Sequence, residues 1–164
     1  LGMADSPGLA FFKAQQATKS PLPESGAVLI TVARKDRSEA LTVARHFQEL
    51  GFRILATEGT QRFLADNGVP SEKILKMHEG RPNIIDAIKN GEIDLVINTP
   101  IGKLSTQDDS YIRKSAIKHN VQYITSLAAA EAAARGIEAW RKGSVQAKSL
   151  QEYHADIRTA SENA

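Results

Sequence analysis

Two hydroxyl residues and a glycine stand where an apolar run changes into a helical pattern. The run 54–56 is followed by Thr57, Gly59 and Thr60, and apolar residues then recur at helical spacing. This order predicts a strand that leads into a helix N-terminus. Unpaired backbone N–H groups and the helix dipole favour an anion there, and a glycine lets a ligand approach the backbone. The stretch fits a phosphate site, but an ordinary N-cap threonine with a turn glycine explains the same residues.

Cationic and amide residues follow the other predicted strands. Arg37 comes after the first strand, Lys76 and His78 lie at the third, and Asn98 follows the fourth. Because the carboxyl ends of parallel strands share one sheet edge, these side chains are expected to converge there. A phosphate is held by charged donors together with neutral N–H and O–H donors. The set predicts an anion site, with solvated loop residues as the alternative interpretation.

The chain offers little for catalysis. It has no cysteine, and its four histidines include no pair at metal-ligand spacing. The nucleophile elbow, the dinucleotide fingerprint and the phosphate loop are all absent from the sequence. His78 is the histidine near the predicted site, and a lone loop histidine is more often solvated than catalytic. The adjacent Asp108 and Asp109 are predicted to precede a helix, where acidic residues usually act as caps.

Strands and helices are predicted to alternate along the chain. Apolar and β-branched runs predict strands over 27–32, 52–56, 74–77, 95–98 and 121–124. Helical spacing predicts helices over 8–17, 38–50, 60–67, 84–89, 111–119, 126–135 and around 150–157. This alternation predicts an α/β fold with a mainly parallel sheet of five strands and helices on both faces. The proline-containing stretch 18–26 predicts a linker, so residues 1–25 form an appendage to a domain over 26–164.

Length and charge narrow the classes of partner. A chain of 164 residues suits one domain with a short appendage. The net charge of +2 does not call for nucleic acid or a membrane surface. No apolar run approaches the roughly 20 residues of a membrane helix, and the N-terminus lacks the pattern of a signal peptide. We therefore expect a cytoplasmic protein.

Four motifs, taken in order and spacing, resemble one family. They are Thr-Glu-Gly-Thr at 57–60, Lys-Met-His-Glu-Gly-Arg-Pro at 76–82, Asn-Gly-Glu-Ile-Asp-Leu-Val-Ile-Asn-Thr at 90–99 and Ile-Arg-Lys-Ser-Ala at 112–116. Together they resemble the methylglyoxal-synthase-like domain at the C-terminus of the carbamoyl-phosphate synthase large chain. Residues 8–15 are similar to the end of the preceding ATP-grasp half, and 149–154 to the closing segment. The resemblance implies a three-layer, Rossmann-like fold and an allosteric domain without an active site.

The resemblance also implies an effector and its contacts. In bacterial members this domain binds UMP, which inhibits, or IMP, which activates. The positions that hold the phosphate in that family match Thr57, Thr60, Lys76 and Asn98. Arg37 stands where the family usually has lysine, which keeps the charge but spreads it over a planar fork. Pro100 replaces a hydroxyl residue of the best-known bacterial pattern, so one contact is expected to be lost.

A second effector and several partners follow from the same resemblance. Tyr123 and Thr125 match positions that contact ornithine in some members. The implied partners are the rest of the large chain and the glutaminase small subunit, with self-association as a further possibility. The parent enzyme makes carbamoyl phosphate from glutamine and bicarbonate, for pyrimidine and arginine biosynthesis, with ATP and Mg or Mn. No cofactor and no metal are expected in this domain itself.

Three other functions fit parts of the pattern. Methylglyoxal synthase, which acts on dihydroxyacetone phosphate, needs a carboxylate base in a Gly-Gly-Asp loop. The corresponding loop here reads Glu79-Gly80-Arg81, and a cation at the base position cannot abstract a proton. The cyclohydrolase half of the bifunctional purine-biosynthesis protein shares the fold, but the C-terminal match argues against it. The third function is an assembly module that binds no effector.

Overall fold

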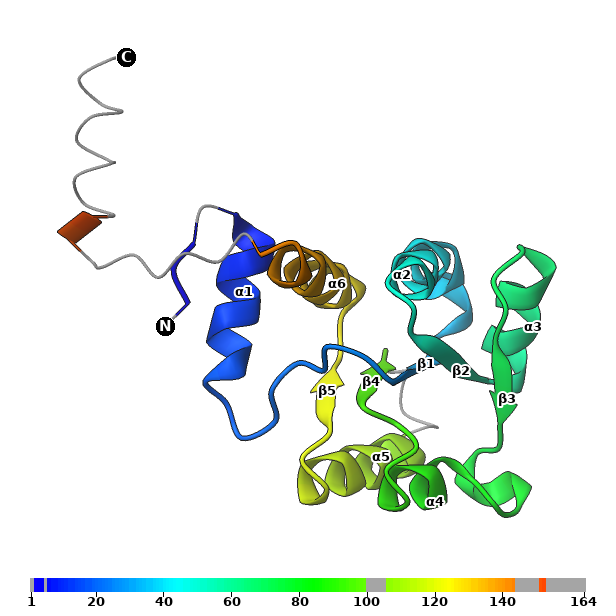
Figure 1. Cartoon of the computed structure of the whole chain (residues 1–164). Helices are drawn as coiled ribbons and strands as arrows, with labels where there is room; N and C mark the ends of the chain where they lie inside the picture. The colour runs from blue at the N-terminus through cyan, green and yellow to red at the C-terminus, as the bar shows by residue number, and fades with distance from the viewer. Residues whose placement is uncertain (1, 5, 100–105, 144–150, 153–164) are drawn as a thin grey trace.

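The computed structural model describes residues 2–4, 6–99, 106–143 and 151–152. The strands of this part are β1 Ala27–Thr31, β2 Arg53–Thr57, β3 Glu72–Ile74, β4 Leu95–Asn98 and β5 Gln122–Ile124. The helices are α1 Pro7–Gln16, α2 Arg37–Glu49, α3 Glu58–Asp66, α4 Ile84–Lys89, α5 Thr106–Lys118 and α6 Leu127–Arg141 (Figure 1). Two 3₁₀ turns, η1 Arg34–Asp36 and η2 Met77–Glu79, follow β1 and β3. None of the helices in these ranges is long and apolar enough to cross a membrane.

The described strands form one parallel sheet in the order β3-β2-β1-β4-β5. The chain passes from β1 outward to β3 and then returns to the other side of β1 as β4. The strand order therefore reverses between β1 and β4, and the crevice at such a reversal is where open α/β sheets bind ligands. The predicted three-layer α/β fold is confirmed, and every pair of described strands is parallel.

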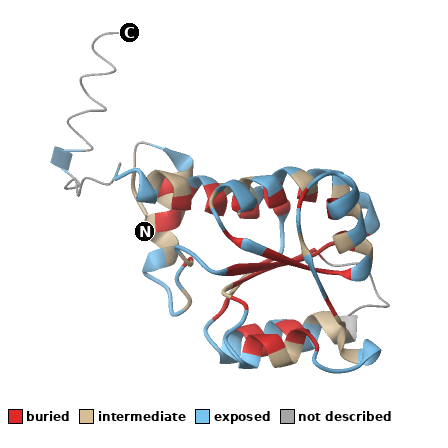
Figure 2. Ribbon diagram, turned by 45° about the vertical axis from the view of Figure 1, so that its right-hand side comes forward, coloured by how far each residue is buried: buried red, intermediate tan, exposed pale blue. Residues whose placement is uncertain are grey.

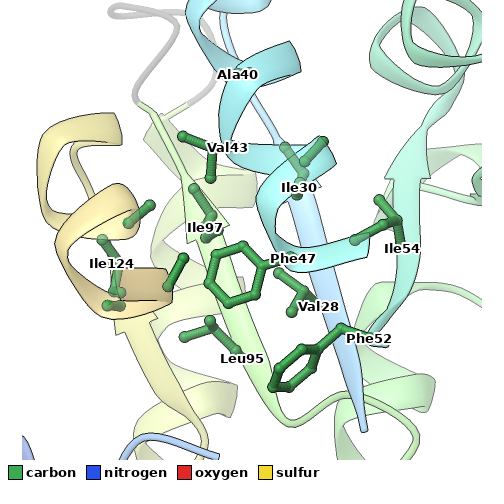
Figure 3. Close-up of a cluster of buried hydrophobic side chains, with 14 of the residues drawn as sticks. Val28, Ile30, Ala40, Val43, Phe47, Phe52, Ile54, Leu95, Ile97 and Ile124 are labelled. Carbon is green, nitrogen blue, oxygen red and sulfur yellow. The ribbon is translucent and has the colours of Figure 1, made fainter. Parts of the chain in front are cut away.

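Two helical layers enclose the sheet (Figures 1 and 2). Helices α2, α3 and α6 supply the apolar cluster on one face, and α4 and α5 supply the cluster on the other. Successive residues of a strand point to opposite faces, so Val28 and Ile30 join the first cluster while Leu29 joins the second. Figure 3 shows Phe47 of α2 beside Val28 of β1. The Phe47 ring meets that of Phe52 edge to face at a centroid distance of 5.4 Å. Burial on both faces explains the continuous apolar strands.

Helix α1 packs directly on α6. Phe12 is fully buried and its ring stacks on that of Trp140 at a centroid distance of 5.1 Å. Gly136 allows the two backbones to touch, because a Cβ at this position would collide with the Gly8 carbonyl oxygen and lie 2.8 Å from the Phe12 Cβ. The division of the chain into an appendage over 1–25 and a domain over 26–164 stays a prediction.

Three boundaries differ by three residues or more from those predicted by the sequence. β3 ends at Ile74, because Leu75 forms a bridge with Asn83 and the next residues turn into η2. α5 begins at Thr106 instead of residue 111, so the two aspartates lie in its first turn. α6 passes through Gly136 and ends at Arg141 instead of residue 135. The helix predicted around 150–157 lies outside the described residues except for 151–152, which are helical.

Candidate functional site

Polar side chains lie at the end, or one residue before the end, of four neighbouring strands. Thr57, Thr31, Asn98 and Tyr123 lie on β2, β1, β4 and β5, and alternation along each strand directs them toward α4 and α5. The first three are buried, with exposed fractions of 4%, 5% and 2%. The hydroxyls of Thr31 and Thr57 are hydrogen-bonded at 3.3 Å. The reversal of strand order therefore lies beneath a continuous polar edge.

Arg37 brings a cation to the N-terminus of α3. Its guanidinium lies over Gly59, so that a Cβ at this glycine would collide with Nη2 of Arg37. Thr60 is buried in the same first turn, with an exposed fraction of 1%. The Nε of Arg37 is buried and has no hydrogen-bond partner among the described residues. A cation beside the positive end of a helix dipole is unfavourable by itself, and an anion in contact with both would relieve this.

Thr99 fixes the turn from which Arg37 projects. Its hydroxyl donates to Oδ2 of Asp36 at 2.9 Å and accepts from the N–H of Ala33 at 3.0 Å. These bonds join the end of β4 to η1, directly ahead of α2. The position of Arg37 is thus set by contacts between segments that are far apart in the sequence.

Lys76 faces the same edge from the opposite layer. It lines a small cavity together with Thr31, Met77, Ile84, Asp108, Asp109 and Ile112. Glu79 accepts the N–H of Lys76 at 2.8 Å and so shapes η2. His78 Nδ1 lies 2.9 Å from Oδ2 of Asp108, which ties η2 to the first turn of α5. The cavity is lined by one cation, two carboxylates, the threonine and apolar side chains.

The side-chain amide of Asn98 is hydrogen-bonded to two other side chains of the protein. Its amide Nδ2 donates to Oδ1 of Asp109 at 3.0 Å and to the Tyr123 hydroxyl at 2.7 Å. A carboxylate accepts and cannot donate, so the amide must present its nitrogen to Asp109. This orientation leaves Oδ1 of Asn98 buried without a hydrogen-bond partner among the described residues. The sequence predicted Asn98 as a phosphate donor, and the contact with Asp109 was missed because α5 was predicted to begin later.

Tyr123 connects the residues predicted to bind the phosphate with those predicted to contact an ornithine-like effector. Burial raises the pKa of its hydroxyl, the hydrogen bond from Asn98 opposes this rise, and the charge of Asp109 adds to it. Tyr123 therefore shares its hydrogen-bond network with Asn98. Thr125 lies beyond the end of β5 and is exposed. Pro100, where the sequence predicts a lost contact, lies outside the described residues.

The loop between η2 and α4 is closed by an ion pair. Arg81 Nε donates to Oδ2 of Asp86 at 3.0 Å, and its Nη2 contacts the other carboxylate oxygen. The same Oδ2 accepts the N–H of Asn83 at 3.0 Å, and Oδ1 of Asn83 accepts the N–H of Ile85 at 3.0 Å. The guanidinium of Arg81, followed by the backbone bond, lowers the pKa of Asp86 to about 2. Arg81 therefore helps to hold Asp86 in the N-terminal cap of α4.

No cluster of three or more His, Asp or Glu that could hold a metal ion occurs among the described residues. The chemistry that their geometry supports is anion binding. The donors lie in one region and come from α2, α3 and η2, around the polar ends of β1 and β2.

Comparison with known proteins identifies the family. The family model of the MGS-like domain matches residues 39–125. The chain belongs to the MGS-like domain family. It is 50% identical over 150 residues to a carbamoyl phosphate synthase large chain of Archaeoglobus fulgidus, which covers 91% of this chain and 14% of that protein. It is 43% identical over 150 residues to the C-terminal section of the large chain of Aquifex aeolicus, covering 92% of this chain and 28% of that section.

The MGS-like domain therefore spans only a small part of these relatives. A methylglyoxal synthase from Elizabethkingia anophelis NUHP1 matches in structure with a TM-score of 0.55 and 18% identity, covering 67% of this chain and 77% of that one. At this identity the match shows a shared fold. The resemblance to the MGS-like domain of the carbamoyl-phosphate synthase large chain, stated above from four motifs, is confirmed.

Proposed function

We propose that this MGS-like domain is the regulatory effector-binding part of a carbamoyl-phosphate synthase large chain. Its effector is a nucleoside monophosphate such as UMP or IMP, whose phosphate binds at the carboxyl edge of the sheet. The names of its relatives support the parent enzyme. Under this proposal ATP and its divalent cation bind to the remainder of the large chain, and the glutaminase small subunit supplies ammonia to it.

The position of Arg37 carries this proposal. Its guanidinium lies over Gly59 at the start of α3, with a buried Nε that has no hydrogen-bond partner among the described residues. Two positive features face one another there, the cation and the helix N-terminus. A phosphate in contact with both would accept hydrogen bonds from both, and charge-assisted bonds of this kind are the strong ones.

The other donors surround the same position. Thr57 and Thr60 are buried at the end of β2 and in the first turn of α3, where their hydroxyls can donate to phosphate oxygens. Lys76 supplies a second cation from η2, across the cavity that Thr31 lines. Tyr123 and Thr125 mark a second effector position, ornithine-like, which the remainder of the large chain would complete.

Regulation follows from a difference in affinity between two arrangements of the whole enzyme. An effector that prefers one arrangement shifts the equilibrium by that difference, typically 1–3 kcal/mol. Calorimetric titration of the chain with UMP, IMP, ornithine and inorganic phosphate tests the binding step. We expect the phosphate-bearing ligands to bind, and Lys76→Ala and Arg37→Ala to weaken binding at least about tenfold each.

A matched control separates the site from overall charge. Lys118 ends α5 and is exposed, at the opposite edge of the sheet. Lys118→Ala removes one positive charge and should leave the affinity for UMP unchanged. Absence of nucleotide binding up to millimolar concentrations, or equal affinities for all three variants, would overturn the assignment of the site.

A further inference from the structure

We propose that Asp109 is an internal competitor of the effector phosphate, and that its contact with Asn98 sets the affinity of the site. This inference rests on the proposed function. It adds a residue that no phosphate would contact favourably and that the effector has to displace.

The contact occupies the donors that a phosphate would use. Asn98 has two amide protons, and one bonds to Oδ1 of Asp109 at 3.0 Å while the other bonds to the hydroxyl of Tyr123 at 2.7 Å. No amide proton of Asn98 is left for a phosphate oxygen. A carboxylate oxygen and a phosphate oxygen are both anionic acceptors, so the two compete for the same N–H group.

Asn98 itself shows that the observed arrangement can be displaced. Its side chain is 2% exposed, and Oδ1 has no hydrogen-bond partner among the described residues. An unpaired buried acceptor destabilises the arrangement that contains it. The contact with Asp109 thus holds the amide in an orientation that satisfies only its nitrogen.

The two aspartates of the α5 first turn have different partners. Asp108 pairs with His78 of η2, whereas Asp109 reaches the sheet edge at Asn98. Both carboxylates line the cavity that also contains Lys76. Asp108 therefore contributes a similar charge at a similar place without occupying the Asn98 amide.

Displacement couples the phosphate to Tyr123. When the phosphate replaces Asp109, the carboxylate and the first turn of α5 must move away from it, since two anions repel at this distance. The amide of Asn98 keeps its hydrogen bond to the Tyr123 hydroxyl when the phosphate takes the place of Asp109. The measured affinity is the intrinsic affinity multiplied by the fraction of molecules in which Asp109 has left Asn98.

Calorimetric titration of Asp109→Asn and Asp109→Ser with inorganic phosphate and UMP tests this exchange. Both variants remove the anionic acceptor: asparagine leaves a neutral amide oxygen, which is a weaker acceptor for the Asn98 amide, and serine leaves a shorter hydroxyl group in the first turn of α5. We expect phosphate and UMP to bind on the order of tenfold more tightly than to the unaltered chain. Asp108→Asn should tighten binding much less, because it removes the same charge but leaves the Asn98 amide occupied. Uridine, which lacks phosphate, should bind equally weakly to all variants.

The outcomes distinguish this inference from the function on which it rests. If Lys76→Ala abolishes binding while Asp109→Asn and Asp109→Ser bind phosphate no more tightly than the unaltered chain, the competitor is refuted and the site stands. Equal tightening by Asp108→Asn and Asp109→Asn would also refute it, since overall charge would then explain the change. If phosphate binds to none of the folded variants, the proposed function itself fails.

Discussion

Arg37 illustrates how one side chain changes the chemistry of a helix N-terminus. The first turn of α3 has the donors common to such turns, and the Arg37 guanidinium above Gly59 adds charge that the helix alone does not supply. The glycine matters for the room it leaves, since a Cβ there would meet Nη2 of Arg37. Gly59 therefore accommodates a side chain of the protein itself.

Gly59→Ala should separate stability from binding. Alanine favours a helix over glycine by up to about 1 kcal/mol, and the obstructing atom belongs to the end of a flexible side chain. We expect the free energy of unfolding to change by less than about 1 kcal/mol, while the affinity for phosphate falls because Arg37 is pushed aside. Urea unfolding and calorimetry on the same protein measure both quantities. Unchanged phosphate affinity would show that Arg37 does not contribute from this position.

The sequence could predict which hydroxyl and cationic side chains lie near the carboxyl edge of the sheet, but not the contacts that they make. Residue type and strand ends were sufficient to select Thr57, Thr60 and Lys76. The contact between Asp109 and Asn98 depends on where α5 begins and on how it lies against the sheet. Neither is a local property, so no pattern near Asp109 could reveal it.

Capping contacts organise the elements around the site. The carboxylate of Asp86 in α4 accepts hydrogen bonds from the Arg81 guanidinium and from the N–H of Asn83, and these bonds shape the loop that follows η2. The helix is only 6 residues long. A helix of this length is marginal alone and depends on its caps and on packing.

The Asp86 cap should make stability depend on acidic pH. Its pKa is about 2 in the folded chain, against an ordinary value of 3.8. Because the folded pKa is depressed, the contribution is complete above about pH 4 and is lost as the pH falls through about 2. Urea unfolding at pH 6, 4 and 2.5 should show a smaller loss for Asp86→Asn than for the unaltered chain. Asp66→Asn, at an exposed position on α3, is the control and should follow the unaltered chain.

Gly136→Ala should destabilise the chain although it improves helix propensity. The gain of about 1 kcal/mol in α6 is opposed by a collision with the Gly8 backbone and the Phe12 Cβ. Overpacking of this kind costs about 1–3 kcal/mol. The single Trp140 stacks on Phe12, so its fluorescence during urea unfolding reports the separation of α1 from α6. A variant that is more stable, with unchanged emission, would contradict the close contact.

The same glycine explains one failure of prediction. The sequence predicts a helix that ends at residue 135, directly before Gly136, and glycine has low helix propensity. Gly136 lies within α6 because α1 passes close to it, which is a tertiary reason. The buried strands were predicted well because their continuous apolar runs record burial directly, whereas the strand order depends on packing between distant segments.

At the scale of the whole molecule, the fold alone does not distinguish an effector-binding domain from an enzyme. The structural match to a methylglyoxal synthase shows a shared architecture at 18% identity. Function therefore depends on the residues at the sheet edge. At the loop where that chemistry needs a carboxylate, Arg81 is paired with Asp86.

Incubation with dihydroxyacetone phosphate tests this distinction. The chain should release no methylglyoxal above the uncatalysed rate, because a guanidinium cannot act as the base. A colorimetric assay for methylglyoxal measures the product, with a known methylglyoxal synthase as the positive control. Turnover that depends on Glu79, the neighbouring carboxylate, would instead identify an active site.

The packing of α1 on α6 has a mechanical consequence. The Phe12 ring stacks on Trp140 and the Gly8 carbonyl lies against Gly136, so a movement of α6 would carry α1 with it. A segment joined to the chain ahead of α1 would therefore move together with α6 and the sheet, and not independently of them.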